Sequence, residues 1–126
     1  MSFCDDLFTR MTTHAGLSAL VGTRVYPVQF RQSGTLPAIR YTTIGSTTPS
    51  AMGSDVGLTD YRYQIDIIDS TYSGANAVRV QLKLALVRWR NAGSPQASFI
   101  LTESDLFDSE TEQYRIRVDM RFVVEE

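Results

Sequence analysis

The fold is decided at residues 61–67, which read YRYQIDI. Tyrosine and isoleucine alternate there with arginine, glutamine and aspartate, so one set of side chains faces a core and the other faces away from it. Residues 69–73, DSTYS, predict a turn in which Ser73 caps a helix. From Ala75 to Trp89 apolar residues recur at helical spacing, with Arg79, Lys83 and Arg90 on the opposite side. The stretch therefore predicts a strand followed by an amphipathic helix.

The last part of the chain, from Tyr114 to Val124, alternates in the same way as residues 61–67. Two half-buried strands and one amphipathic helix are typical of the α+β class. We therefore expect a single domain over residues 1–126, with an antiparallel sheet of about four to five strands and two to three flanking helices. The side chains expected to face the core on the last strand are Tyr114, Ile116, Val118, Met120 and Phe122.

Shorter signals place the remaining elements around these strands. An apolar stripe from Phe3 to Met11 predicts a first helix, and residues 15–21 predict a second helix that Gly22 ends. Residues rich in β-formers predict a short edge strand at 24–27 and a longer strand at 36–44. The helices and the extra strands complete the expected α+β layer.

Two stretches are interpreted as loops. Residues 45–57 are small and polar and too many for a tight hairpin, so they form either a protruding contact loop or a tip without a role. Residues 103–112 contain several acids and are interpreted as a second, acidic loop. Both alternatives for the first loop remain open at this point.

The composition excludes several function classes. A net charge of −2 argues against a broad nucleic-acid footprint, because such a footprint requires clustered basic side chains. Cys4 is the only cysteine, so an intrachain disulfide is impossible, and we expect this thiol to be a small buried apolar group. Acids follow the first residues where a signal peptide has basic ones, and no apolar run approaches the ~18 residues that span a bilayer. We expect a cytosolic protein without a membrane segment.

Reactive side chains are few and scattered. His14 is the only histidine, and beside Gly16 at a helix break it is interpreted as a surface or capping residue. Glu110 and Glu112 lie two residues apart, and with His14 they are the only candidates for an enzymatic or ligand-binding site. The glycines at 45, 53 and 57 match neither a phosphate loop nor a dinucleotide fingerprint. We expect no catalytic residue, no metal site and no cofactor.

The charged residues on the outward side of the last strand, beside the outward side of residues 60–66, form one candidate contact region. Mixed-sign charge on a sheet suits either a solvated face or a polar subunit contact, in which arginine is favoured for its planar head with several donors. Both interpretations stay open. The candidate contact residues, together with the two loops, are Thr47, Thr48, Ser50, Met52, Ser54, Asp55, Arg62, Glu110, Glu112, Arg115, Arg117, Asp119 and Arg121.

Four segments in order resemble the tail completion, or tail terminator, proteins of long-tailed bacteriophages and related prophages. They read ALVGTRVYP at 19–27, LPAIRY at 36–41, YQIDI at 63–67 with TYSGA at 71–75, and YRIRVDM at 114–120. The resemblance spans nearly the whole chain. It offers no catalytic residue to carry over, because the matching segments are mostly core positions.

The resemblance implies a structural virion protein, made in the host cytoplasm, that forms a ring, commonly of six copies, at the head-proximal end of the tail. Such a ring stops polymerisation of the tail tube and presents a surface to the head–tail connector. The implied partners are other copies of the chain, the tube protein and the connector, with no membrane and no sequence-specific nucleic acid, while DNA can pass through the ring channel. The alternatives are a connector or stopper protein of the neck and, in a different class, a small enzyme or ligand-binding domain.

Overall fold

The computed structural model describes residues 3–29, 35–47, 50–51, 54–55, 58–87, 89, 95 and 97–125. For residues 50, 51, 54, 55, 58 and 125 it describes the backbone alone. The helices are α1 (Phe3–Thr13), α2 (Ala15–Val21) and α3 (Tyr72–Leu86). The strands are β1 (Val25–Pro27), β2 (Ala38–Thr47), β3 (Ser50–Ala51), β4 (Ser54–Asp55), β5 (Leu58–Asp69), β6 (Ala97–Asp108) and β7 (Gln113–Glu125).

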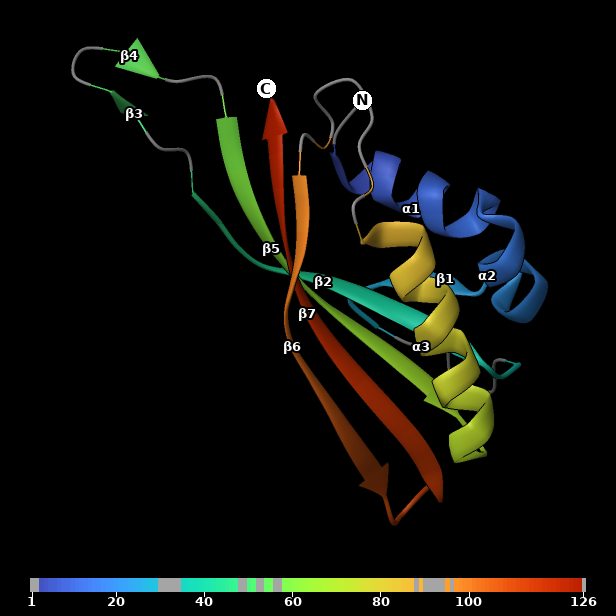
Figure 1. Cartoon of the computed structure of the whole chain (residues 1–126). Coiled ribbons are helices and arrows are strands. Elements are labelled where there is room, and N and C mark those ends of the chain that lie inside the picture. The colour runs from blue at the N-terminus through green and yellow to red at the C-terminus, as the bar shows by residue number, and fades with distance from the viewer. Residues whose placement is uncertain are drawn as a thin grey trace.

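A five-stranded sheet with the order β1-β2-β5-β7-β6 forms one layer, and the helices cover one of its faces (Figure 1). β2, β5, β7 and β6 pair antiparallel along the order of the sheet, whereas β1 pairs parallel with β2. The predicted α+β class, with a largely antiparallel sheet and flanking helices, is confirmed. The predicted short edge strand is also confirmed, because β1 lies at one edge of the sheet.

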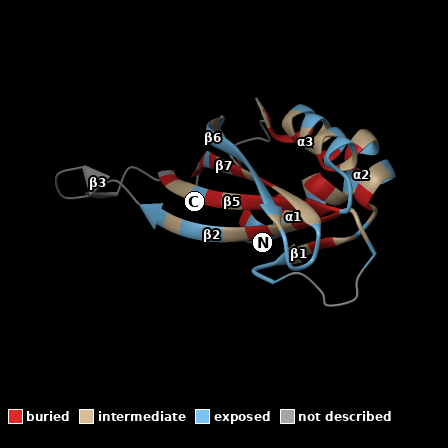
Figure 2. Cartoon of the chain, turned by 90° about the horizontal axis from the view of Figure 1, so that it is seen from below, coloured by how far each residue is buried: buried red, intermediate tan, exposed pale blue. Residues whose placement is uncertain are grey.

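The core lies between the helices and the sheet, and β5 is buried along most of its length (Figure 2). Its centre is an aromatic cluster in which the Phe3 ring lies 5.0 Å from Phe122 and 6.0 Å from Trp89, centroid to centroid. Tyr63 joins the cluster from β5, with its ring 5.9 Å from Phe122. The alternation predicted for residues 61–67 and 114–124 is therefore the alternation that builds this core.

The helix ends follow from local hydrogen bonds. His14 caps α2, because its Nδ1 accepts the backbone N–H of Leu17 at 3.3 Å, which confirms its interpretation as a capping residue. Gly22 follows α2 with a φ of 58°, a conformation that favours glycine. The expected cap of α3 was wrong: Thr71 accepts the N–H of Gly74, and Ser73 lies within the first turn.

Three further expectations need correction. α3 ends at Leu86, so Trp89 lies beyond the helix. Trp89 is nevertheless buried, and its backbone N–H donates to Ser98 Oγ at 3.2 Å. Cys4 is exposed, because it lies outside the buried stripe of α1 that Phe3, Leu7 and Met11 form. The predicted acidic loop at 103–112 is mostly strand: residues 103–108 belong to β6 and only 109–112 form a turn.

The predicted loop at 45–57 is also partly regular. β2 continues to Thr47 opposite Asp60, and the two-residue strands β3 and β4 pair antiparallel beyond it. These strands extend the β2–β5 hairpin away from the helices (Figure 1). Among the described residues, no helix combines the length and the apolar character needed to cross a membrane.

Candidate assembly surface

The face of the sheet turned away from the helices, here called the outer face, carries a dense array of charge. Strand register places its side chains in rows that run across β2, β5, β7 and β6. Among the described side chains of these four strands, it carries five arginines and four aspartates. The charged residues are Arg40, Asp60, Arg62, Asp66, Asp108, Arg115, Arg117, Asp119 and Arg121.

One row contains a buried ion cluster. Asp66 is 0% exposed, although it lies on the outer face, because Arg40 and Arg117 extend over it from the two neighbouring strands. Arg40 Nε donates to Asp66 Oδ2 at 2.9 Å, and Arg117 Nε donates to Oδ1 at 3.3 Å. Gln64 Nε2 adds a donor at 3.2 Å. This carboxylate is already satisfied within the chain, so it is not available to a partner.

A second row is not satisfied in this way. Arg62 lies directly opposite Arg121, and like charges directly opposite on one face of a sheet repel each other. Arg121 donates to Asp60 at 2.9 Å and lies 5.9 Å from the Phe99 ring. Arg62 is exposed and forms no hydrogen bond or ion pair with another described residue. This row carries net positive charge that the described part of the chain leaves uncompensated.

β6 is the edge strand on the far side of the sheet, and its outer face is apolar where its neighbour is basic. Phe99 lies opposite Arg121, and Leu106 lies opposite Arg115. Phe99, Leu101 and Leu106 are 48%, 41% and 42% exposed. A twelve-residue edge strand with exposed apolar side chains is a ready surface for another chain.

The turn between β6 and β7 is acidic. It contains Glu110 and Glu112 and follows Asp108, the last residue of β6; these three acids and the turn are here called the acidic turn. The backbone N–H of Glu110 donates to Asp108 Oδ1 at 3.0 Å, and this hydrogen bond holds the pKa of Asp108 below its usual range. Glu112 has a φ of 55°, so the turn is built on a left-handed residue. The turn therefore has a defined shape.

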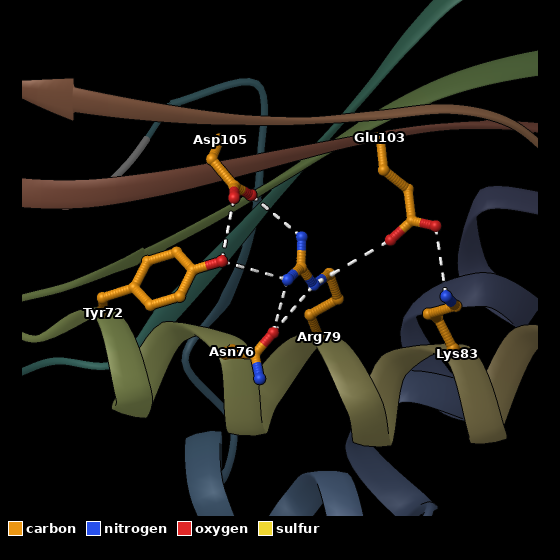
Figure 3. A network of polar contacts seen from close by, with 6 residues as sticks. All are labelled: Tyr72, Asn76, Arg79, Lys83, Glu103 and Asp105. Atoms are coloured by element: carbon orange, nitrogen blue, oxygen red, sulfur yellow. Dashed lines mark hydrogen bonds and ion pairs between the residues drawn. The ribbon is translucent and has the colours of Figure 1, made fainter.

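A polar network fixes β6 to α3 on the helix side of the sheet (Figure 3). Arg79 donates to Asp105 at 2.9 Å and to Asn76, and the Tyr72 hydroxyl donates to Asp105 at 2.8 Å. Lys83 lies 3.1 Å from Glu103. Each exposed pair contributes little by itself, but the network orients the strand that leads to the acidic turn. It also explains why acids occur at alternate positions of β6.

The structure gathers some of the predicted contact residues and separates others. Arg62, Arg115, Arg117, Asp119 and Arg121 share the outer face, as predicted, and Thr47 lies at its end, opposite Asp60. Glu110 and Glu112 lie in the acidic turn, where Glu110 is near Arg115 and Arg117. The backbones of Ser50, Ser54 and Asp55 lie in β3 and β4, while Thr48 and Met52 fall outside the described residues.

Sequence reasoning missed several residues of this surface. Arg40 occupies an outward position of β2, and its alternation with Ile39 and Tyr41 was a signal for that. Leu106 was missed because residues 103–112 were interpreted as a loop, and Phe99 was missed because no strand was predicted there. Register across strands, which no single segment contains, is what joins these residues to the arginines.

The residues considered for an enzyme or ligand site do not converge. His14 caps α2 in the helical layer, whereas Glu110 and Glu112 lie at the β6–β7 turn (Figure 1). A shallow depression of about 400 Å³ beside this turn is lined by Glu110, Arg115 and Arg117 among others, and it opens to solvent. Within the described residues, no group of three or more His, Cys, Asp or Glu side chains is placed to hold a metal ion.

A small α+β chain with a mixed-charge sheet face and an apolar edge has the surface of a structural protein that binds other proteins. The comparisons are more specific. Residues 5–125 match the family model described as "Tail completion protein gp17", and the chain belongs to this family. It is therefore a structural tail protein of a phage-type virion, where it contacts other structural proteins.

One solved structure with the same fold comes from the virion of a native gene transfer agent particle. Its chain is 20% identical and superposes with a TM-score of 0.75, over 95% of this chain and 92% of that one. At this identity the likeness concerns the fold. No curated protein matches the sequence.

Proposed function

We propose that this protein caps the head-proximal end of the tail tube as a ring of copies, commonly six, and helps to join the tail to the head. The observation that carries the proposal is the match to the tail completion family over residues 5–125. Its partners in this role are further copies of the chain, the tube protein and the head–tail connector. DNA would pass through the channel of the ring.

The shape of the subunit supports this role. A cap must bind the tube with one axial face and present a different face to the connector, and ring contacts must be heterologous and close on themselves. The sheet ends differently on its two sides: the β2–β5 hairpin with β3 and β4 projects one way, and the β6–β7 hairpin projects the other (Figure 1). Residues 45–57 contain one acid, whereas the opposite end carries the acidic turn. The two projecting ends therefore offer different chemistry.

Deleting the gene tests the proposal. Without a cap the tube continues to polymerise, so electron microscopy of the lysate should show overlong tails that are not attached to heads. Supplying the wild-type chain from a plasmid should restore tails of uniform length. Tails of normal length beside leaking heads would contradict the capping role and would assign the chain to the stopper of the neck instead. Intact particles with attached tails would contradict both roles.

A further inference from the structure

We propose that the acidic turn of one copy docks on the outer face of the next copy, against the row that contains Arg62 and Arg121. The proposal rests on the ring of the proposed function and names the contact that closes it. The occupant of the outer face is thus a second copy of this chain. Charge complementarity between two separate parts of the same sheet is the observation that carries it.

The receiving side is the row of Arg62, Arg121 and Phe99. Arg62 and Arg121 lie directly opposite each other on β5 and β7, and among the described residues Asp60 pairs with Arg121 and not with Arg62. An anion placed between them would remove their repulsion. Phe99 lies in the same row and is 48% exposed. Arginine beside an aromatic ring is the composition that protein interfaces favour at their centre.

The donating side is the acidic turn. The side chains of Glu110 and Glu112 are exposed and form no hydrogen bond or ion pair with the described residues. The hydrogen bond from Glu110 N–H to Asp108 fixes the turn, and Arg79 fixes β6 to α3 through Asp105. The carboxylates are therefore presented on an ordered hairpin, which reduces the entropy lost on binding.

The outer face suits a protein better than it suits DNA. Two partly exposed aspartates, Asp60 and Asp119, interrupt the arginines, and a phosphate backbone would meet these carboxylates as well. The neighbouring β6 edge adds exposed Phe99, Leu101 and Leu106, which need an apolar partner surface. The chain has a net charge of −2, so other copies supply the acidic complement to a face with more arginines than aspartates.

The two sides lie at different places on one subunit, so their contact is head-to-tail. A C2 dimer would bury the same patch on both copies, whereas a head-to-tail contact repeats around a ring until it closes. Each junction then uses the acidic turn of one copy and the row of Arg62, Arg121 and Phe99 of the next copy. Every copy in the ring would have both sides occupied.

Charge reversal tests the contact. Arg62→Glu and Glu110→Lys should each weaken self-association of the purified chain at least about tenfold, because each places like charges across the junction. The double variant Arg62→Glu/Glu110→Lys should recover most of this loss, because each junction again pairs opposite charges. Sedimentation velocity up to high concentration measures the association, and complementation of the deletion measures tail assembly. Thr9→Glu/Ala19→Glu, on exposed positions of α1 and α2, makes the same change in net charge as Arg62→Glu, but away from the sheet, and should have no effect.

Folding is checked separately. Arg62 and the Glu110 side chain have no partner among the described residues, so the urea midpoint of each variant should not fall below that of the wild type. If a reversed charge lowers the midpoint, the neutralised variants Arg62→Ala and Glu110→Gln replace the reversed ones and should weaken association by a smaller factor.

The proposal is overturned if both single variants associate and assemble tails as the wild type does, or if the double variant recovers nothing. It is also overturned if Arg62→Glu loses only binding to random-sequence DNA, which would assign the outer face to nucleic acid. The proposed function fails separately: a deletion that leaves tails normal, with association still following the charge swap, refutes the cap and leaves the contact standing. Overlong tails in the deletion, with association indifferent to both charges, refute the contact and leave the cap standing.

Discussion

We expect Asp66→Asn to lower the free energy of unfolding by about 2–3 kcal/mol. The Asp66 carboxylate is 0% exposed and accepts hydrogen bonds from Arg40, Arg117 and Gln64. Asparagine keeps the volume but removes the negative charge, so two guanidinium groups would face each other over a neutral amide. Removing one partner of a fully buried ion pair can lower the free energy of unfolding by more than this. We expect the smaller loss because the side chains of Arg40 and Arg117 are 22% and 38% exposed and can reach water. Urea denaturation followed by circular dichroism measures the change.

Asp60→Asn is the matched control for this prediction. Asp60 lies on the same strand and the same face and pairs with one arginine, Arg121, but its side chain is 28% exposed and that of its partner 44%. The loss should stay below about 1 kcal/mol. Equal midpoints for the wild type and Asp66→Asn would contradict the buried ion cluster as a structural element of the outer face.

Phe122→Ala should cost about 3–5 kcal/mol, the largest effect that we predict for one side chain. Phe122 is 0% exposed and its ring contacts those of Phe3, Tyr63 and Trp89, so its removal leaves a cavity where β7 meets α1. A domain of this size has a total stability of about 5–15 kcal/mol. The variant should therefore unfold at a much lower urea concentration than the wild type.

Phe107→Ala is the control for aromatic removal. Phe107 is 54% exposed and contacts Tyr114 near the acidic turn, with ring centroids 4.9 Å apart. Its loss should cost less than about 1.5 kcal/mol. If the two phenylalanine variants have the same midpoint, the aromatic cluster does not hold the sheet to the helices.

Local periodicity was enough to predict β5 and β7, because each strand is half buried and its own residues report which side is buried. Ile65 and Ile67 in β5 and Ile116 and Val118 in β7 are all 0% exposed, as the alternation predicts. Gly22 likewise marks the end of α2 by itself. The α+β class follows from these local signals.

The rest depends on contacts between segments distant in the sequence. Residues 103–108 were interpreted as a loop, because Glu103 and Asp105 are poor β-formers; Lys83 and Arg79 of α3 stabilise them in β6. Asp66 was expected on the outward side, and it is buried there because register places an arginine on each side of it. No pattern within one strand reveals its neighbours.

The candidate surface, like the fold, was predictable only where the signal lies within one strand. The outward arginines of β7 and Arg62 could be predicted from alternation alone, and the structure places them on one face. The joining of this face to Arg40, Phe99 and Leu106 required the pairing of β2 and β6. Family resemblance supplied the tail completion role, which no residue of the chain reveals by its chemistry.

Cryo-electron microscopy of the neck in purified particles tests the central claim most directly. The account predicts a closed ring of this subunit between the last ring of the tail tube and the connector, with the acidic turn of each copy against Arg62 of its neighbour. Density for the chain at the far tip of the tail, or as single copies that do not touch each other, would contradict it.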